Sequence, residues 1–159
     1  MGKERKAISS SAIIVFDRDV RMSELNELTK DFNGDIVITG ELLVDECPHI
    51  KCDLHIMGYV ICTPDQSFNV EGDLYCYNEM ASYNMCIDGN LYCEGTISSD
   101  DIRVEGTLCC KGKIEAYGGK ITVMGDFECH GIKANTVEVY GETYMEGPIS
   151  IRKFMRSGC

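Results

Sequence analysis

A short pattern with a glycine at its centre recurs along most of this chain and limits what the chain can fold into. It is clearest in IRVEGTLCCKGKI, at 102–114, and in the related segments at 85–97 and 121–133. In each segment a second glycine follows the first by six residues, and apolar residues occupy every second position. A period of two is the period of a β-strand, so each unit predicts a strand, a glycine and a second strand.

Looser copies of the unit extend the repeat on both sides, and together the copies predict the fold class. The first glycines of the seven copies are Gly40, Gly58, Gly72, Gly89, Gly106, Gly125 and Gly141. They lie 14 to 19 residues apart, whereas a β-α-β unit needs about 30 residues. Alternating apolar residues also fail to line one face of a helix. We therefore predict an all-β chain, a parallel β-helix (β-solenoid) of about seven short coils whose aligned columns stack as inward ladders.

The two ends of the chain lack the repeat. We predict an N-terminal cap over 1–34, made of a short strand and a short helix that follows Ser23 and stops at Asn33-Gly34. A solenoid end exposes an apolar cross-section and needs such a cover. The alternative for this segment is a helix that touches a membrane or a partner. The β-solenoid is predicted over 35–151 and a basic C-terminal tail over 152–159.

Ten cysteines are present, and half of them share one column of the alignment. These five, predicted to be inward, reduced and metal-free, are Cys62, Cys76, Cys93, Cys110 and Cys129. Buried cysteine packs as a small apolar residue. Cys86 and Cys109 are predicted to point outward, and they and the terminal Cys159 are predicted to react quickly. Exposed thiols without a recognisable signal peptide favour a reducing cytoplasm.

A second group, Cys47, His49, Cys52 and His55, has a spacing that suggests zinc. Strand alternation places the two histidines on the opposite face from Cys52, so four ligands would not converge. We therefore predict no metal site.

Charge and motif content argue against several classes of function. The net charge of −11 disfavours nucleic acid and acidic membranes as simple electrostatic partners. The chain has no glycine-rich phosphate loop, no G-x-S-x-G, no H-E-x-x-H and only three histidines. We predict no catalytic residue and no cofactor, and therefore no enzyme.

One outward column of the alignment is unusually apolar and aromatic. Three residues after the repeat glycine it contains Leu43, Ile61, Tyr75, Tyr92 and Tyr144, together with Cys109 and Glu128. Tyrosine is enriched at protein interfaces, and apolar bands mark contact surfaces. We predict that these five apolar and aromatic residues mediate self-association along one flank. The alternative is that the 1–34 segment or a turn covers part of the band.

The repeat resembles that of a known family. The units IRVEGTLCCKGKI and VEVYGETYMEGPI are similar to the units of bactofilins, which are bacterial polymer-forming cytoskeletal proteins. The resemblance covers about 35–151. It implies a right-handed β-helix of short triangular coils that polymerises end to end without nucleotide, often near the membrane. Cysteine stands here in a column that is usually aliphatic in the family.

These observations lead to two functional expectations. The first is a non-enzymatic structural scaffold in a bacterial cytoplasm that self-associates into oligomers or filaments. Its partner would be the chain itself, with another protein or the membrane periphery as further candidates and no nucleic acid. The alternative is a monomeric or dimeric β-solenoid binding module for a protein or glycan partner.

Overall fold

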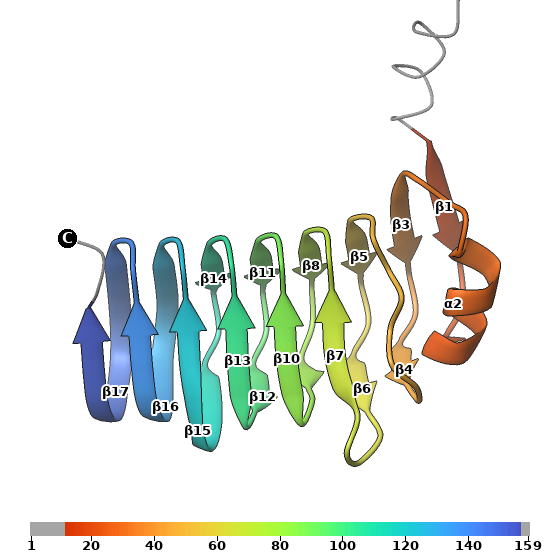
Figure 1. Ribbon diagram of the computed structural model, residues 1–159. Helices are drawn as coiled ribbons and strands as arrows, with labels where there is room; N and C mark the ends of the chain where they lie inside the picture. Colours follow the sequence, from red (N-terminus) through yellow and green to blue (C-terminus); the bar gives the residue numbers. More distant parts are fainter. Residues whose placement is uncertain (1–11, 157–159) are drawn as a thin grey trace, which may run out of the picture.

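The computed structural model describes residues 12–156 and confirms a parallel β-solenoid of about seven turns with one short N-terminal helix. Every strand pairing within this range is parallel, and each strand pairs with a strand of the turn before or after it. In Figure 1 the front strands run upward and the chain crosses over the top to the back as it advances from the right end to the left. This winding is right-handed.

The strands stack on three faces, named here X, Y and Z in chain order. Face X contains β1 (Ile13–Phe16), β3 (Asp35–Ile38), β5 (Leu54–Ile56), β8 (Leu74–Cys76), β11 (Leu91–Cys93), β14 (Leu108–Cys110) and the first parts of β16 (Phe127–Val139) and β17 (Thr143–Arg156). Face Y contains β2 (Val20–Arg21), β4 (Leu42–Val44), β6 (Val60–Cys62), β9 (Met80–Ala81), β12 (Ile97–Ser99), the start of β15 (Ile114–Val123) and the middle of β16 and β17. Face Z contains β7 (Ser67–Val70), β10 (Asn84–Ile87), β13 (Asp101–Val104) and the ends of β15, β16 and β17.

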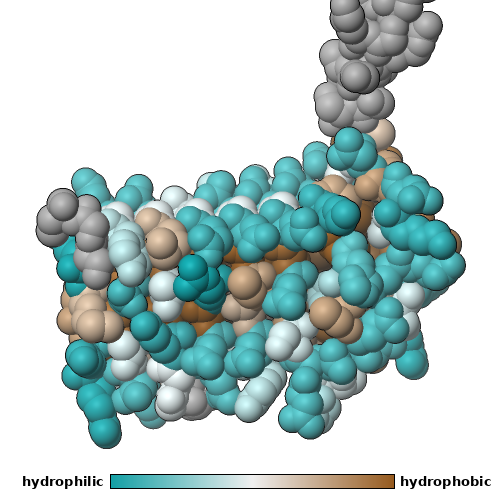
Figure 2. Space-filling view, viewed as in Figure 1, coloured by the Kyte–Doolittle hydropathy of each residue, from teal (hydrophilic) through white to brown (hydrophobic). Residues whose placement is uncertain are grey.

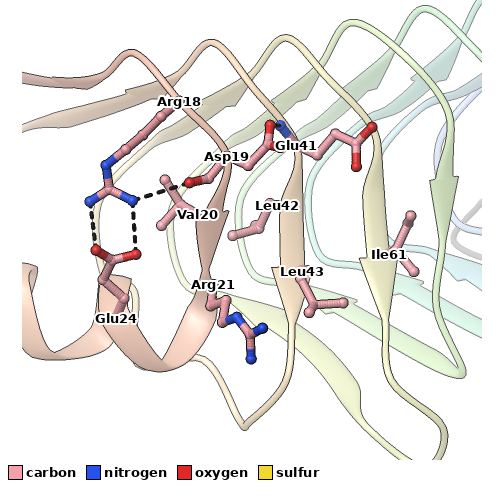
Figure 3. Close-up of a pocket in the computed structure, with 9 residues that line it drawn as sticks. All are labelled: Arg18, Asp19, Val20, Arg21, Glu24, Glu41, Leu42, Leu43 and Ile61. Atoms are coloured by element: carbon pink, nitrogen blue, oxygen red, sulfur yellow. Dashed lines mark hydrogen bonds and ion pairs between the residues drawn. The ribbon is translucent and has the colours of Figure 1, made fainter.

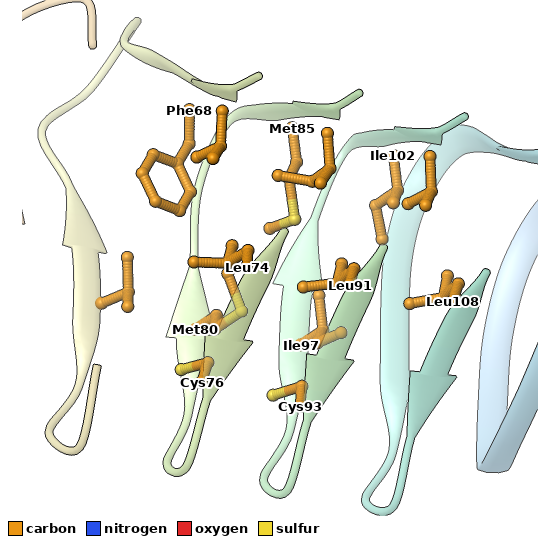
Figure 4. Packing of buried hydrophobic residues seen from close by; sticks show 14 of the residues in the cluster. Phe68, Leu74, Cys76, Met80, Met85, Leu91, Cys93, Ile97, Ile102 and Leu108 are labelled. Atoms are coloured by element: carbon orange, nitrogen blue, oxygen red, sulfur yellow. The ribbon is translucent and has the colours of Figure 1, made fainter. Parts of the chain in front are cut away.

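The core is the interior of this triangular stack. Alternation within each strand sends every second side chain inward, and in the central turns these side chains are almost fully buried, as Phe68, Leu91 and Ile102 show in Figure 4. Neighbouring turns also approach closely at the corners. A Cβ atom on Gly112 would lie 2.5 Å from the carbonyl oxygen of Gly95 in the turn below. The repeat glycines therefore allow the corners to stack at the spacing of paired strands.

The first two copies of the repeat are placed one face away from where the alignment put them. β5 precedes Gly58, yet it pairs with β8, which follows Gly72, so Leu54 lies beside Leu74 rather than Phe68. The backbone N–H of Gly58 donates to the carbonyl of Gly40. The later first glycines occupy a different corner, where the N–H of Gly89 donates to the carbonyl of Gly72. The alignment on seven glycines was therefore wrong for its first two copies.

The N-terminal segment is partly cap and partly solenoid. β1 and β2 already pair with β3 and β4, so the ladder begins at Ile13, earlier than the predicted boundary at 35. The helix is α2 (Met22–Thr29); it starts one residue before Ser23 and ends before Asn33-Gly34. The helix residues Met22 and Leu25 are fully buried. Residues 1–11 of the predicted cap lie outside the described residues.

The C-terminal boundary also moves outward. Residues 152–156 were predicted as tail, but they form the last part of β17, where Phe154 pairs with Val137 on face Z. Residues 157–159, including Cys159, lie outside the described residues. The last turn of the described stack therefore runs from Thr143 to Arg156.

Candidate interaction surfaces

The five residues predicted to mediate self-association lie on two different faces. Leu43 pairs with Ile61 on face Y, and the column continues to Ala81. Tyr75 and Tyr92 pair on face X, and Tyr144 lies further along the same face. The single predicted band therefore does not exist. The error follows from the misplaced Gly40 and Gly58 copies, which carried Leu43 and Ile61 into the wrong column.

Face X instead carries an aromatic stack that includes a residue missed by the sequence analysis. His55 pairs with Tyr75, and their rings stack with centroids 4.4 Å apart and planes 1° apart. Tyr75 and Tyr92 continue the stack at 5.1 Å. Beside it, at the corner that follows, Met57 is 39% exposed and Tyr77 is 46% exposed. We call these five residues, namely His55, Met57, Tyr75, Tyr77 and Tyr92, the aromatic patch.

Carboxylates line the patch on its other edge. The Oδ1 atom of Asp53 accepts the backbone N–H of Asp73 at 2.8 Å, and the Oδ1 atom of Asp73 accepts that of Asn90 at the same distance. These bonds hold the two acidic side chains at the corner of successive turns. Partial burial and the negative charges of Asp73 and Asp53 raise the pKa of Tyr75 above its ordinary value. The two carboxylates therefore place negative charge along this edge of the patch.

Face Y begins with a shallow groove beside the N-terminal helix, shown in Figure 3. The groove has a volume of about 450 Å³ and is lined by Leu43 and Ile61, with Arg21 at one end. Its outer wall is the ion pair in which both terminal nitrogens of Arg18 donate to the carboxylate of Glu24, at 3.0 and 2.5 Å. The groove therefore has an apolar floor, and the charged residues Asp19, Arg21 and Glu41 line it as well.

Face Z is the most polar of the three faces. It is the side seen in Figure 2, where hydrophilic side chains cover most of the surface. Its outward residues form ion pairs within the face, such as Arg103 with Glu105 at 2.7 Å and Lys120 with Glu138 at 2.8 Å.

The C-terminal end of the stack is open within the described residues. β17 pairs with β16 on one side, and no described strand pairs with its other edge. Ile149 and Phe154 occupy inward columns, yet they are 51% and 41% exposed because no turn covers them. The buried hydroxyl of Thr143 in the same turn has no hydrogen-bond partner among the described residues. An unpaired strand edge of this length is a template for association.

Four of the five predicted inward cysteines form one column on face X. Cys76, Cys93, Cys110 and Cys129 are buried; Cys62 lies on face Y beside Val44 and is only partly buried. The thiols of Cys76 and Cys110 donate to backbone carbonyls of Asn78 and Gly95, each at 3.3 Å. All nine described cysteines are free thiols. Figure 4 shows Cys76 and Cys93 facing into the stack.

These surroundings disfavour thiolates. Hydrogen bonding with Cys110, opposed in part by the bond with Cys76, and then burial raise the pKa of Cys93 to about 12. Burial raises the pKa of Cys129 to about 11. Cys86 and Cys109 point outward as predicted but are partly buried, and this burial raises the pKa of each thiol. Cys47 is the exposed cysteine of the described chain.

The described residues contain no group of three or more histidine, cysteine or carboxylate side chains that could hold a metal ion. His55, one member of the C-x-H-x2-C-x2-H spacing, stacks on Tyr75 instead. No helix between residues 12 and 156 is long and apolar enough to cross a membrane.

Comparison with known proteins leaves the fold as the basis for any functional argument. No protein-family model, no curated protein and no solved structure matches this chain.

Proposed function

We propose that this chain is a non-enzymatic structural protein that self-associates through the C-terminal end of its solenoid. The observation that carries the proposal is the last described turn, β17, whose outer edge pairs with no described strand and whose Ile149 and Phe154 are exposed in inward columns. Another turn stacked on this end would bury both side chains and pair the backbone groups of the edge. This is the contact that neighbouring turns already make throughout the stack.

Two further arguments support a scaffold. A repeat of this kind is a rigid rod whose length is set by the number of turns, which suits a structural role. End-to-end assembly without nucleotide is also what the resemblance of the repeat to bactofilins implies. The free thiols are consistent with a reducing cytoplasm. The joined end of the second copy can be its own C-terminal end, which gives a closed dimer. A filament instead requires the N-terminal end of the second copy, where α2 occupies face Z and β1 on face X would accept the next strand.

Sedimentation velocity and negative-stain microscopy of the purified chain test the proposal. We expect dimers or filaments, which moderate salt strengthens because each chain carries a charge of −11. The double variant Ile149→Lys with Phe154→Lys should be monomeric, since it places charge in the buried part of the contact. Tyr144→Lys is the matched control: it lies in the same turn and is 60% exposed, but it points outward on face X.

Wild-type chain that remains monomeric at every concentration and salt strength would contradict the proposal. Equal loss of assembly in the control would show that added charge, rather than the open end, is responsible. Assembly that survives the double variant would place the contact elsewhere. The columns with Leu43 and Ile61, and with Tyr75 and Tyr92, would then be the next flanks to mutate.

A further inference from the structure

The aromatic patch on face X differs from the open end in both place and chemistry. It lies on the side of the stack, over three successive turns, and so remains accessible when chains join end to end. We propose that this patch is a docking surface for an extended, Arg- or Lys-rich segment of a partner protein. The proposal is independent of self-association.

The arrangement of the rings disfavours a carbohydrate as the occupant. His55, Tyr75 and Tyr92 stack on one another, with centroids 4.4 and 5.1 Å apart, so the inner ring faces are covered by neighbouring rings. A sugar ring packs on an open aromatic face, whereas this stack presents ring edges and the tyrosine hydroxyls to its surroundings. Edges and hydroxyls suit the aliphatic stems and polar groups of protein side chains.

The charges around the patch favour a cationic occupant. In the segments 53–57, 73–77 and 90–94 the chain has three carboxylates, Asp53, Asp73 and Glu94, and no lysine or arginine. Asp53 and Asp73 lie along one edge of the aromatic stack. On the other edge Glu94 lies beside Tyr77, one turn further along the stack. The N–H of Glu94 donates to the carbonyl of Cys76, the residue before Tyr77. Negative charge therefore lies along the edge with Asp53 and Asp73, and on the other edge it lies at Glu94, which Lys111 follows in the next turn.

The same carboxylates disfavour a second copy of this chain as the occupant. Pairing two patches would bring the carboxylates of one copy against those of the other, at a net charge of −11 per chain. Nucleic acid and anionic lipid would meet the same repulsion. An arginine or lysine side chain can lay its stem on Met57 and Tyr77 and direct its charge to a carboxylate. A basic segment therefore satisfies both the aromatic patch and the carboxylates.

The test uses two probes: a nine-residue peptide of alternating Arg and Ser, and the matching Glu and Ser peptide. Isothermal titration calorimetry on the full chain should detect binding of the first and not of the second. The affinity should fall as salt rises, which is opposite to the salt response expected for self-association. A failed peptide experiment therefore leaves the end-to-end proposal standing, and the reverse also holds.

Two pairs of variants locate the site. Asp53→Asn with Asp73→Asn should weaken binding about tenfold, as expected for the loss of two charge-assisted contacts. Asparagine should preserve the corner, because it can accept the same backbone hydrogen bond as aspartate. Asn90 already does so in this column, where its side-chain oxygen accepts the N–H of Thr107 in the next turn. The matched control is Asp126→Asn with Glu142→Gln, which makes the same charge change in the same corner column away from the patch.

The second pair tests the rings without changing charge. Tyr75→Ala with Tyr92→Ala should weaken binding of the Arg peptide about tenfold, while Asn69→Ala with Thr122→Ala on face Z should leave it unchanged. Circular dichroism confirms that each variant is folded. Equal affinity for the Arg peptide in the patch and control variants would overturn the proposal, as would binding of the Glu peptide or no binding of the Arg peptide. A ring-dependent loss of self-association without peptide binding would assign the patch to a second copy instead.

Discussion

The two ends of the stack finish the same repeat in opposite ways. At the N-terminal end, α2 takes the place of a face Z strand and buries its Met22 and Leu25 completely, although Ile14 and Phe16 in the inward columns of β1 stay partly exposed. At the C-terminal end the corresponding position is Phe154, which is 41% exposed with no described residue over it. Figure 1 shows the helix on the right end and the bare strand β17 on the left.

The difference comes from local contacts that only the N-terminal end makes. The backbone N–H and hydroxyl of Ser23 donate to the carboxylate of Asp45 in the next turn, at 2.9 and 2.8 Å. The side chain of Asn26 donates to Glu46 and accepts the N–H of His49. The irregular stretch after β4 is thus the surface on which the helix rests. A closed end limits growth of the stack, and an open end permits it.

The largest effect should separate a central inward position from a terminal one in the same column. Ile102 and Phe154 both point inward on face Z, but Ile102 is 1% exposed. Ile102→Asp should destabilise the fold by several kcal/mol, because it buries an unpaired charge. Phe154→Asp should change the melting temperature little and reduce assembly instead. Thermal unfolding by circular dichroism measures both; equal melting temperatures for the two variants would contradict the assigned core.

The next effect should show that the N-terminal helix acts as a cover. Leu25→Ala should cost about 2–5 kcal/mol, the range for removing a fully buried leucine side chain. Leu28→Ala on the same helix is the control: Leu28 is 56% exposed, so its change should stay within about 0.5 kcal/mol. Urea denaturation gives both values. A large loss for Leu28→Ala would mean that the outer side of the helix is covered in solution.

The thiol column should make the fold sensitive to alkali. Cys93 and Cys129 have folded pKa values of about 12 and about 11, against an ordinary value of 9.0. The folded state therefore holds these protons more tightly, and its stability should be full below pH 9 and fall as pH rises toward 11 and 12. The slope is at most about 1.4 kcal/mol per pH unit for each thiol.

Cys93→Val and Cys129→Val test this linkage, because each should flatten the loss of stability between pH 9 and 11. Cys47→Ser is the control, because Cys47 lies outside the buried column and is exposed near the N-terminal helix. For the same reason Cys47 should be the first of the described cysteines to react with an alkylating reagent. An unchanged alkaline slope in both valine variants would show that other groups cause it.

The smallest effect concerns the contact between the helix and the next turn. Asp45→Ala should cost about 1 kcal/mol, the usual cost of losing the cap of a helix N-terminus. Although desolvation raises it, the hydrogen bonds from Ser23 lower the pKa of Asp45 below its ordinary value of 3.8. This contribution should therefore be present above about pH 4 and disappear at lower pH. Comparison of the acid unfolding curves of the wild type and Asp45→Ala checks it; parallel curves would exclude the contact as a source of stability.

Much of the fold could be predicted because strand alternation is a local property. The inward positions in the central turns, such as Met85, Ile87 and Val104, were identified from the period of two and are buried. Four of the five aligned cysteines also lie in one buried column. The open end could not be predicted, because residues 152–156 lack the glycine pattern and join the stack only through pairing with β16.

The interaction surfaces were harder to predict because they depend on which strands become neighbours. The 14-residue spacing from Gly58 to Gly72, shorter than the others, was the available sign that these glycines occupy different corners. The stack of His55 on Tyr75 follows from that change of corner. Sequence reasoning aligned His55 with Asn69 instead, and so it missed the start of the aromatic patch.

The sequence by itself determined the strand-turn-strand unit, the parallel stack and the alternation of inward and outward residues. The same local pattern, apolar residues two and four positions on either side of a glycine, occurs at two corners of the triangle, as around Gly40 and around Gly89. Nothing within such a unit distinguishes one corner from the other. Only the hydrogen bonds between turns decide it, since Gly58 contacts Gly40 and Gly89 contacts Gly72. The tertiary structure therefore decided which outward side chains share a face.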